Sequence, residues 1–248
     1  HKRVQTSIYQ VFSWGSGRNG QLGLGHTEDR PFACPVEALQ GVDIAAVFCG
    51  VFHSMAVCSS GAPYAWGNNS SGQCGRKDPL SPRLIEGLED FPVTDMAGGW
   101  DHTLALSRCG AVFAIGGGYR DRRSPGAPSA LGGTVASATT GGVVGEQDGS
   151  IPVRIGGDAL GATRVKTIAS GWHHCMAVTD EGALFSWGSG RGGQLGHGDV
   201  EPRHSPTRVA LFSTPAGDRV CSIAGGRTCS AATTADGRLF KWGLNSKG

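Results

Sequence analysis

One pattern of spacings recurs four times in this chain and constrains its fold more than any other feature. A first column of three histidines and one cysteine lies 13 residues before a second column of three tryptophans and one isoleucine. The first column is His53, His102, His174 and Cys229; the second is Trp66, Ile115, Trp187 and Trp242. A glycine lies eight residues after each first-column residue, at Gly61, Gly110, Gly182 and Gly237. Columns that keep one register over four copies identify a repeat protein.

Each copy predicts a β-hairpin followed by an irregular loop. In the copy that contains Trp187, residues 174–178 and 183–188 are two short β-type runs on either side of an Asp-Glu-Gly turn. Glycine can supply the positive φ that such turns need. No window in these runs keeps a helical period for the length of a helix. The glycine-rich residues 193–198 predict a loop, and residues 206–209 predict an outer strand that begins with proline.

The size of the repeat favours a β-propeller. Starting from Trp14, the second-column positions are 52, 49, 72 and 55 residues apart, which leaves room for about four strands in each unit. We therefore predict an all-β chain with about four to five four-stranded blades in a single domain over residues 1–248. Its repeats are anchored at Trp14, Trp66, Ile115, Trp187 and Trp242, and we expect these side chains to be buried between blades. Glycines three residues before the first column suit innermost strands, where blades crowd the axis: Gly50, Gly99, Gly171 and Gly226.

The complete repeat pattern resembles that of a known family. It reads Gly-x-x-His-x-x-Ala, then a turn glycine, aromatic-x-Trp-Gly and Gly-Gln-x-Gly, and it runs from Gly171 to Gly196. The same pattern runs from Gly50 to Gly75, with Cys74 in place of leucine. The chain is thus similar to the regulator of chromosome condensation 1 family over almost its whole length. The resemblance implies a propeller, usually of about seven blades, in which each repeat straddles two neighbouring blades.

Two copies depart from the pattern, and the two ends of the chain duplicate one element. Ile115 replaces tryptophan and has no Gly-Gln-x-Gly after it, and Cys229 replaces histidine. The chain begins on the first column and stops just before a Gln-x-Gly, so it holds five inner hairpins and four connecting halves. We therefore expect a piece of a longer ring, or a ring that closes with another subunit.

Composition argues against several classes of protein. The 22 basic and 20 acidic residues give a net charge of +2, which does not indicate nucleic-acid binding. No apolar run approaches the roughly 18 residues of a membrane span, and no signal peptide opens the chain. We expect an intracellular protein, cytoplasmic or nuclear, without membrane insertion. The eight cysteines contain no Cys-x-x-Cys pair and favour buried reduced thiols over a zinc site; we expect neither a metal nor a cofactor.

Motifs that suggest an enzyme have structural explanations. Residues 15–20 and 188–193 both spell the Gly-x-Gly-x-x-Gly fingerprint of dinucleotide-binding proteins. That chemistry requires a helix after the glycines, whereas Gln-Leu-Gly follows here, so we predict turns. One histidine in each unit is expected to be a buried hydrogen-bonding tie between strands rather than a metal or catalytic set. Since no nucleophile elbow or carboxylate pair stands out, we predict no catalytic residue.

Two groups of residues are candidates for partner binding. Trp100-Asp101 and Trp172-His173 stand off the main tryptophan column, and aromatic side chains exposed on one propeller face would suit protein contacts. The second group lies in an insertion, residues 117–150, whose Ala/Gly/Ser/Thr-rich composition predicts a flexible surface loop. The alternative is a binding arm that grips acidic protein or phosphate. Its candidate contacts are Tyr119, Arg120, Arg122 and Arg123.

Three functions are compatible with this sequence. We favour a non-catalytic scaffold that binds other proteins through its loops. The resemblance also implies guanine-nucleotide exchange on a small GTPase, the activity of the family's founding member, although its exchange residues do not map onto this chain. The third function is a regulatory propeller of a larger protein such as a kinase or a ubiquitin ligase. The expected partners are therefore other proteins, including a small GTPase or a large assembly.

Overall fold

The computed structural model describes residues 10–75, 80–117, 149–155, 160, 163–212 and 218–244, which fold into five antiparallel sheets. This part of the chain contains 17 strands and two 3-10 helices of three residues each, η1 (Glu37–Leu39) and η2 (Ala210–Phe212). The prediction of an all-β fold is confirmed. No helix within the described ranges is long and apolar enough to cross a membrane.

Three of the sheets have four strands each. Sheet 2 contains β3 (Ile44–Cys49), β4 (His53–Cys58), β5 (Pro63–Gly67) and β6 (Arg83–Leu84). Sheet 3 contains β7 (Val93–Gly98), β8 (His102–Ser107), β9 (Val112–Gly116) and β10 (Val153–Ile155). Sheet 4 contains β11 (Val165–Ser170), β12 (His174–Thr179), β13 (Leu184–Gly188) and β14 (Arg203–Arg208). In each sheet the strands pair in chain order, which is the connectivity of a meander.

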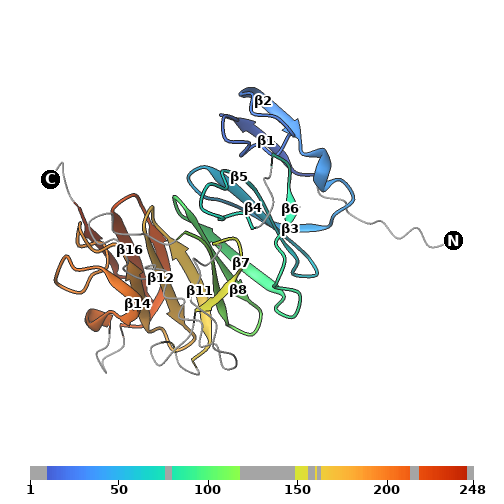
Figure 1. The fold of residues 1–248 in the computed structure, drawn as a ribbon. Coiled ribbons are helices and arrows are strands. Elements are labelled where there is room, and N and C mark those ends of the chain that lie inside the picture. Colours follow the sequence, from blue (N-terminus) through green and yellow to red (C-terminus); the bar gives the residue numbers. More distant parts are fainter. Residues whose placement is uncertain are drawn as a thin grey trace, which may run out of the picture.

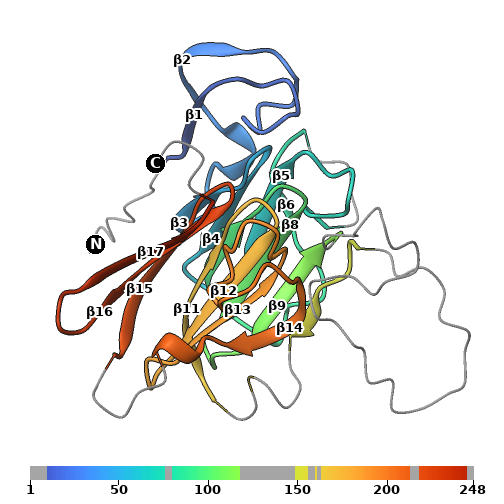
Figure 2. The same ribbon diagram turned by 90° about the vertical axis from the view of Figure 1, so that its left-hand side faces the viewer.

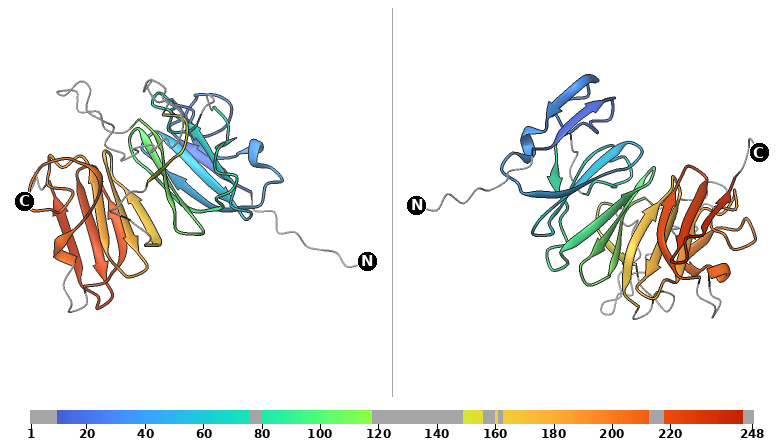
Figure 3. Two further views of the ribbon diagram at one scale, coloured as in Figure 1. Left: turned by 60° about the horizontal axis from the view of Figure 1, so that its bottom comes forward. Right: turned by 180° about the vertical axis from the view of Figure 1, so that it is seen from behind.

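The two flanking sheets are smaller. Sheet 1 contains β1 (Phe12–Gly15) and β2 (Arg30–Pro35). Sheet 5 contains β15 (Val220–Gly225), β16 (Cys229–Thr234) and β17 (Leu239–Gly243). Figure 1 shows the sheets following one another in chain order, and the further views show them fanned side by side like blades (Figures 2 and 3). The first strands β7, β11 and β15 contact one another across neighbouring sheets, and β3 contacts β7, so these strands lie innermost.

The hairpin turns follow the predicted glycine column. Gly61, Gly110, Gly182 and Gly237 all have a positive φ, between 84° and 94°, a conformation that costs glycine little. The column also touches the next sheet: a Cβ on Gly182 would lie 2.9 Å from the Cα of Arg219, which precedes β15. The Gly182 carbonyl accepts a hydrogen bond from the Val220 amide at 3.0 Å. The turn glycine therefore serves both the hairpin and the joint to the following sheet.

The position three residues before the first column requires glycine for a second reason, besides crowding at the axis. A Cβ on Gly171 would overlap the imidazole of His174, three residues later in its own sheet. It would also lie 2.5 Å from the carbonyl oxygen of Gly226, in the neighbouring sheet. The backbone must therefore leave room for the histidine ring as well as for the next blade.

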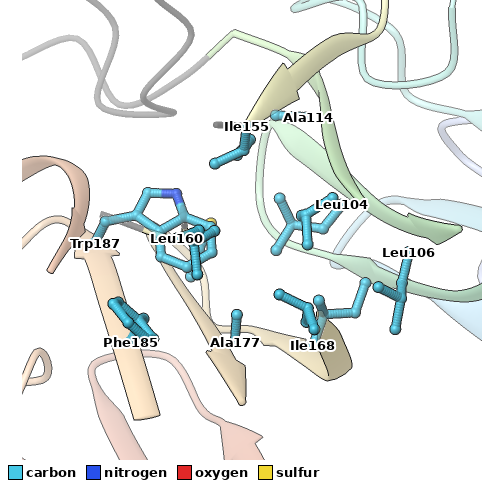
Figure 4. Close-up of a cluster of buried hydrophobic side chains, with 12 residues drawn as sticks. Leu104, Leu106, Ala114, Ile155, Leu160, Ile168, Ala177, Phe185 and Trp187 are labelled. Atoms are coloured by element: carbon cyan, nitrogen blue, oxygen red, sulfur yellow. The ribbon is translucent and has the colours of Figure 1, made fainter. Parts of the chain in front are cut away.

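The hydrophobic core is divided among the junctions between sheets. Between sheets 3 and 4, Leu104 and Leu106 of β8 pack with Phe185 and Trp187 of β13 (Figure 4). Trp187 is fully buried and Trp66 is 3% exposed. Because each sheet presents one face to its neighbour, the cores are wedges between blades, as expected for a propeller.

The expectation that every second-column residue is buried is wrong for Trp14. Its side chain is 63% exposed. Trp66, Trp187 and Trp242 pack against the sheet that precedes their own, and the described residues contain no sheet before sheet 1. Trp242 in the three-stranded sheet 5 is half-buried. Burial of a second-column tryptophan therefore depends on the neighbouring sheet against which it packs.

The glycine fingerprints form turns. The Gly20 amide donates to the Gly17 carbonyl at 2.7 Å, and the Gly193 amide donates to the Gly190 carbonyl at the same distance. The residues after each turn, 21–25 and 194–198, are irregular rather than helical. They cannot provide the helix N-terminus that a dinucleotide phosphate needs.

Candidate functional site

Buried histidines tie neighbouring sheets together. His53 Nε2 lies 2.8 Å from Thr103 Oγ1, and His174 Nε2 lies 2.8 Å from Ser230 Oγ. Each histidine is at most 1% exposed. The sequence predicts ties between strands, and the structure places the hydroxyl partners in the next sheet rather than in the same one.

The tautomer of these two histidines follows from the hydrogen bond that each hydroxyl partner donates to a loop carbonyl. Thr103 Oγ1 donates to the Gln73 carbonyl at 2.8 Å, and Ser230 Oγ donates to the Gln194 carbonyl at 2.8 Å. A hydroxyl has one proton to donate, so it must accept from the imidazole, which therefore carries its proton on Nε2. Burial, and to a lesser degree the charge of His102, lowers the pKa of His53 and of His174 to about 4. Both rings are neutral at physiological pH.

The Gly-Gln-x-Gly loops supply the carbonyl groups that these ties need. The Gln21 carbonyl accepts hydrogen bonds from Trp66 Nε1 at 2.9 Å and from Ser54 Oγ at 2.8 Å. The Gln194 carbonyl accepts in the same way from Trp242 Nε1 at 2.9 Å. These two loops therefore satisfy the indole N–H of the tryptophan in the following sheet.

The junction between sheets 3 and 4 is different. His102 Nε2 lies 3.1 Å from Ser170 Oγ and 3.3 Å from Cys175 Sγ. Its Nδ1 faces Asp101 Oδ1 at 3.5 Å. Burial acts to lower the pKa of His102, but the thiolate form of Cys175 and the carboxylate of Asp101 outweigh it, so that the pKa rises to about 10 once Cys175 has given up its proton.

The tryptophan at this junction also lacks its usual partner. Trp187 Nε1 is buried and has no hydrogen-bond acceptor within the part of the chain that the structure describes. The reason is visible in the sequence, since the copy that contains Ile115 has no Gly-Gln-x-Gly loop to offer a carbonyl. The two ends of the insertion nevertheless meet, because the Gly116 amide donates to the Gly149 carbonyl at 2.6 Å.

Four side chains from successive sheets stack on one face of the molecule, and we call them the aromatic ladder: Phe52, Trp100, Trp172 and Arg227. The rings of Phe52 and Trp100 meet edge to face, with centroids 4.8 Å apart, and those of Trp100 and Trp172 lie 4.7 Å apart. The Arg227 guanidinium stands 4.3 Å from the centroid of Trp172, within cation–π range. All four residues come from the loops between the first two strands of sheets 2 to 5.

Backbone contacts hold the aromatic ladder in place. The Trp100 amide donates to the Trp172 carbonyl at 2.9 Å, and the Val51 amide donates to the Gly99 carbonyl at 3.0 Å. Trp100 is 36% exposed and Arg227 is exposed, while Phe52 and Trp172 are partly buried. The ladder is therefore a preformed surface with aromatic area open to solvent.

Asp101 and His173 flank the ladder. His173 Nδ1 lies 3.9 Å from Asp101 Oδ1, and its ring centroid lies 6.0 Å from that of Trp100. Burial lowers the pKa of His173, against the opposing effect of Asp101. The structure thus brings together Trp100, Asp101, Trp172 and His173, as the sequence suggested. Sequence reasoning missed Phe52 and Arg227, although both lie in the same short segment between the glycine and the first-column residue.

The other candidates differ in what the structure says of them. Tyr119, Arg120, Arg122 and Arg123 lie outside the described residues. No cluster of three or more His, Cys, Asp or Glu side chains with metal-binding geometry occurs in the described segments. None of the eight cysteines forms a disulfide; three are buried, three are exposed and two are intermediate. The expectation of buried thiols therefore holds for only some of them.

The repeated sheets, their wedge-shaped cores and their joining loops define a repeat protein of the β-propeller class. Residues 10–248 match the family model described as the RCC1-like domain, and the chain belongs to this family. It is 31% identical to the ultraviolet-B receptor UVR8 of Arabidopsis thaliana over 242 residues, which are 96% of this chain and 50% of that protein. It is 30% identical to the human E3 ubiquitin-protein ligase HERC2 over 255 residues, 100% of this chain and 5% of that protein.

Solved structures show the same fold. The crystal structure of human WBSCR16 matches 92% of this chain and 54% of that chain, with a TM-score of 0.72 and 25% sequence identity. Prp20p from Saccharomyces cerevisiae, described with its binding properties to Gsp1p and histones, matches 96% of this chain and 67% of that chain with a TM-score of 0.52 and 22% identity. The chain thus spans half or less of the two curated relatives named above.

Proposed function

We propose that this chain is a non-catalytic protein-binding propeller region whose contact surface includes the aromatic ladder with Asp101 and His173. The observation that carries the proposal is the stack of Phe52, Trp100, Trp172 and Arg227 across four sheets. Aromatic and arginine side chains are enriched among residues that dominate binding energy at protein interfaces. A rigid surface loses little conformational entropy when a partner docks.

The family supports this reading. UVR8 is a receptor by name and HERC2 is a ubiquitin-protein ligase, and the region similar to this chain is only 5% of HERC2. A propeller region of this size fits a binding or regulatory part of a larger protein. The exposed, reduced thiols of Cys49, Cys109 and Cys221 suit an intracellular, reducing compartment.

Guanine-nucleotide exchange is the alternative. The crystal structure of Prp20p was reported together with its binding to Gsp1p and histones, but its likeness to this chain extends to the fold alone. No feature of the ladder favours a GTPase over other proteins, so exchange ranks second.

The test compares partner capture by the wild-type protein and three variants. Trp100→Ala and Trp172→Ala remove ladder residues, and Phe32→Ala is the control, because Phe32 is 66% exposed on β2 of sheet 1 and outside the ladder. We expect each tryptophan variant to lower the affinity for specific partners about 30-fold or more. This is the effect of losing a hot-spot residue that contributes about 2 kcal/mol to binding. Quantitative mass spectrometry of captured proteins, with melting curves of each variant, measures this.

If both tryptophan variants capture the same partners as the wild-type protein and melt at the same temperature, the aromatic ladder is not the contact surface. Accelerated nucleotide release from a panel of small GTPases would instead favour exchange.

A further inference from the structure

Cys175 occupies a position where the other sheets carry a hydroxyl. The residue after the first column is Ser54, Thr103 and Ser230 in sheets 2, 3 and 5, and Cys175 in sheet 4. In sheet 3 the Thr103 hydroxyl donates to the backbone carbonyl of Gln73, and in sheet 5 the Ser230 hydroxyl donates to that of Gln194. In sheet 4 the preceding copy lacks the Gly-Gln-x-Gly loop. Cys175 Sγ instead faces His102 Nε2 at 3.3 Å.

The protonation of His102 is reversed relative to the other two buried histidines. Asp101 Oδ1 faces Nδ1 of His102 at 3.5 Å, and a carboxylate can only accept, so the ring proton belongs on Nδ1. While Cys175 keeps its own proton, Nε2 is then a lone-pair base directed at the Cys175 thiol and the Ser170 hydroxyl. A nucleophile, a base and a group that orients the base in this order are the arrangement that activates cysteine thiols.

A second feature of this junction points to a ligand atom beside the sulfur. Trp187 Nε1 is fully buried and has no acceptor among the described residues. Cys175 pairs directly with Trp187 across β12 and β13, and both side chains belong to the core between sheets 3 and 4. Directly paired residues of an antiparallel sheet lie side by side on one face. The indole N–H is therefore an unused donor in the same core as the Cys175 sulfur.

We propose that Cys175 is a peroxide-reactive thiol, with His102 as its base and Asp101 as the residue that positions His102. His102 takes the thiol proton, and the resulting thiolate attacks one oxygen of hydrogen peroxide. The sulfur–oxygen bond forms as the oxygen–oxygen bond breaks, and the leaving hydroxide takes the proton from the His102 imidazolium to give water. The sulfur is oxidised by two electrons to a sulfenic acid, and the peroxide is reduced. The new oxygen can accept a hydrogen bond from Trp187 Nε1.

The chain contains its own controls for accessibility. Cys74 is 2% exposed, comparable to Cys175 at 1%. The Cys74 thiol donates to the Asn68 carbonyl at 3.3 Å and therefore keeps its proton in that bond. Cys49 and Cys221 are exposed and report the reactivity of unprotected thiols.

The experiment treats the folded protein with hydrogen peroxide, traps sulfenic acid with dimedone and measures each cysteine by peptide mass spectrometry. We expect Cys175 to react at least tenfold faster than Cys74. His102→Asn should remove this difference, and Asp101→Asn should reduce it, whereas Asp101→Glu should restore most of it. A purely structural Asp101 would not give rescue of the rate by glutamate.

Equal rates for Cys175 and Cys74 in the wild-type protein would overturn the proposal, because burial alone would then set both rates. If His102→Asn fails to fold, Cys74 and Cys175 will both become reactive in that variant. The wild-type ratio and the two Asp101 variants then decide. An undiminished ratio in Asp101→Asn would remove Asp101 from its positioning role.

Discussion

The junctions on either side of sheets 3 and 4 are joined by ties from a histidine through a hydroxyl to a loop carbonyl, whereas the junction between those two sheets lacks the loop carbonyl and its histidine contacts Ser170 and Cys175 instead. At the first kind of junction, a neutral histidine donates to a hydroxyl, and the hydroxyl donates to a loop carbonyl. At the second kind, His102 faces a thiol and a carboxylate, and the buried indole of Trp187 has no acceptor among the described residues. The comparison shows that three features occur together where the Gly-Gln-x-Gly loop is missing. Trp187 Nε1 has no acceptor among the described residues, Cys175 stands where the other sheets have a hydroxyl, and His102 has its proton on the other ring nitrogen.

The largest effect should come from creating a cavity in the core between sheets 3 and 4. Trp187→Ala removes a fully buried indole and should lower the free energy of unfolding by about 3–5 kcal/mol, the usual cost of such a cavity. Trp14→Ala, at a side chain that is 63% exposed, should cost less than about 1 kcal/mol. Urea or guanidinium unfolding of both variants measures the difference. Equal losses would mean that the sheet 3–4 junction is not held by its core.

The next effect concerns the tied junctions and pH. The pKa values of His53 and His174 fall from the ordinary 6.5 to about 4 in the folded protein. Above pH 6.5 both folded and unfolded states are neutral at these sites. As the pH falls from 6.5 to about 4, the unfolded chain takes up protons and the folded one does not, so stability falls with decreasing pH. Each histidine should contribute a loss of roughly 3 kcal/mol over this window.

Unfolding free energies measured between pH 7 and pH 4 test this expectation. His53→Asn should be less stable at pH 7 and should show a shallower slope with pH, because one proton uptake is gone. An unchanged slope would show that His53 is already protonated, or accessible, in the folded state.

The smallest expected effect is the contribution to stability of one indole hydrogen bond, which Trp66 makes and Trp187 lacks among the described residues. Trp66→Phe removes a bond of 2.9 Å to the Gln21 carbonyl, whereas Trp187→Phe removes an indole N–H without an acceptor among the described residues. We expect Trp66→Phe to cost about 1 kcal/mol more than Trp187→Phe. The two variants are matched in the size of the change, and a reversed order would show that Trp187 Nε1 has an acceptor.

The sequence predicted the elements and their order because the repeat encodes them locally. The turn glycines, the strand alternation and the spacing of the second column are enough to place hairpins such as β12–β13. It could not predict that Trp14 is exposed, because burial depends on which strands lie beside it rather than on its own segment. It also missed the carbonyl groups of Gln21 and Gln194, since a backbone acceptor has no signature in the side-chain pattern. In the aromatic ladder, Phe52 and Arg227 are not among the residues that the sequence selects as candidates, because they share a place in the fold with Trp100 and Trp172 but not a residue type.

Every junction in the described structure joins sheets that are consecutive along the chain. The Gln21 carbonyl of sheet 1 accepts a hydrogen bond from Trp66 of sheet 2, and the Gln194 carbonyl of sheet 4 accepts one from Trp242 of sheet 5. Assembly can therefore proceed vectorially, each newly synthesised hairpin docking on its predecessor without waiting for distant segments. Evolution can likewise alter a single joint, as at Ile115, while the remaining joints keep their chemistry.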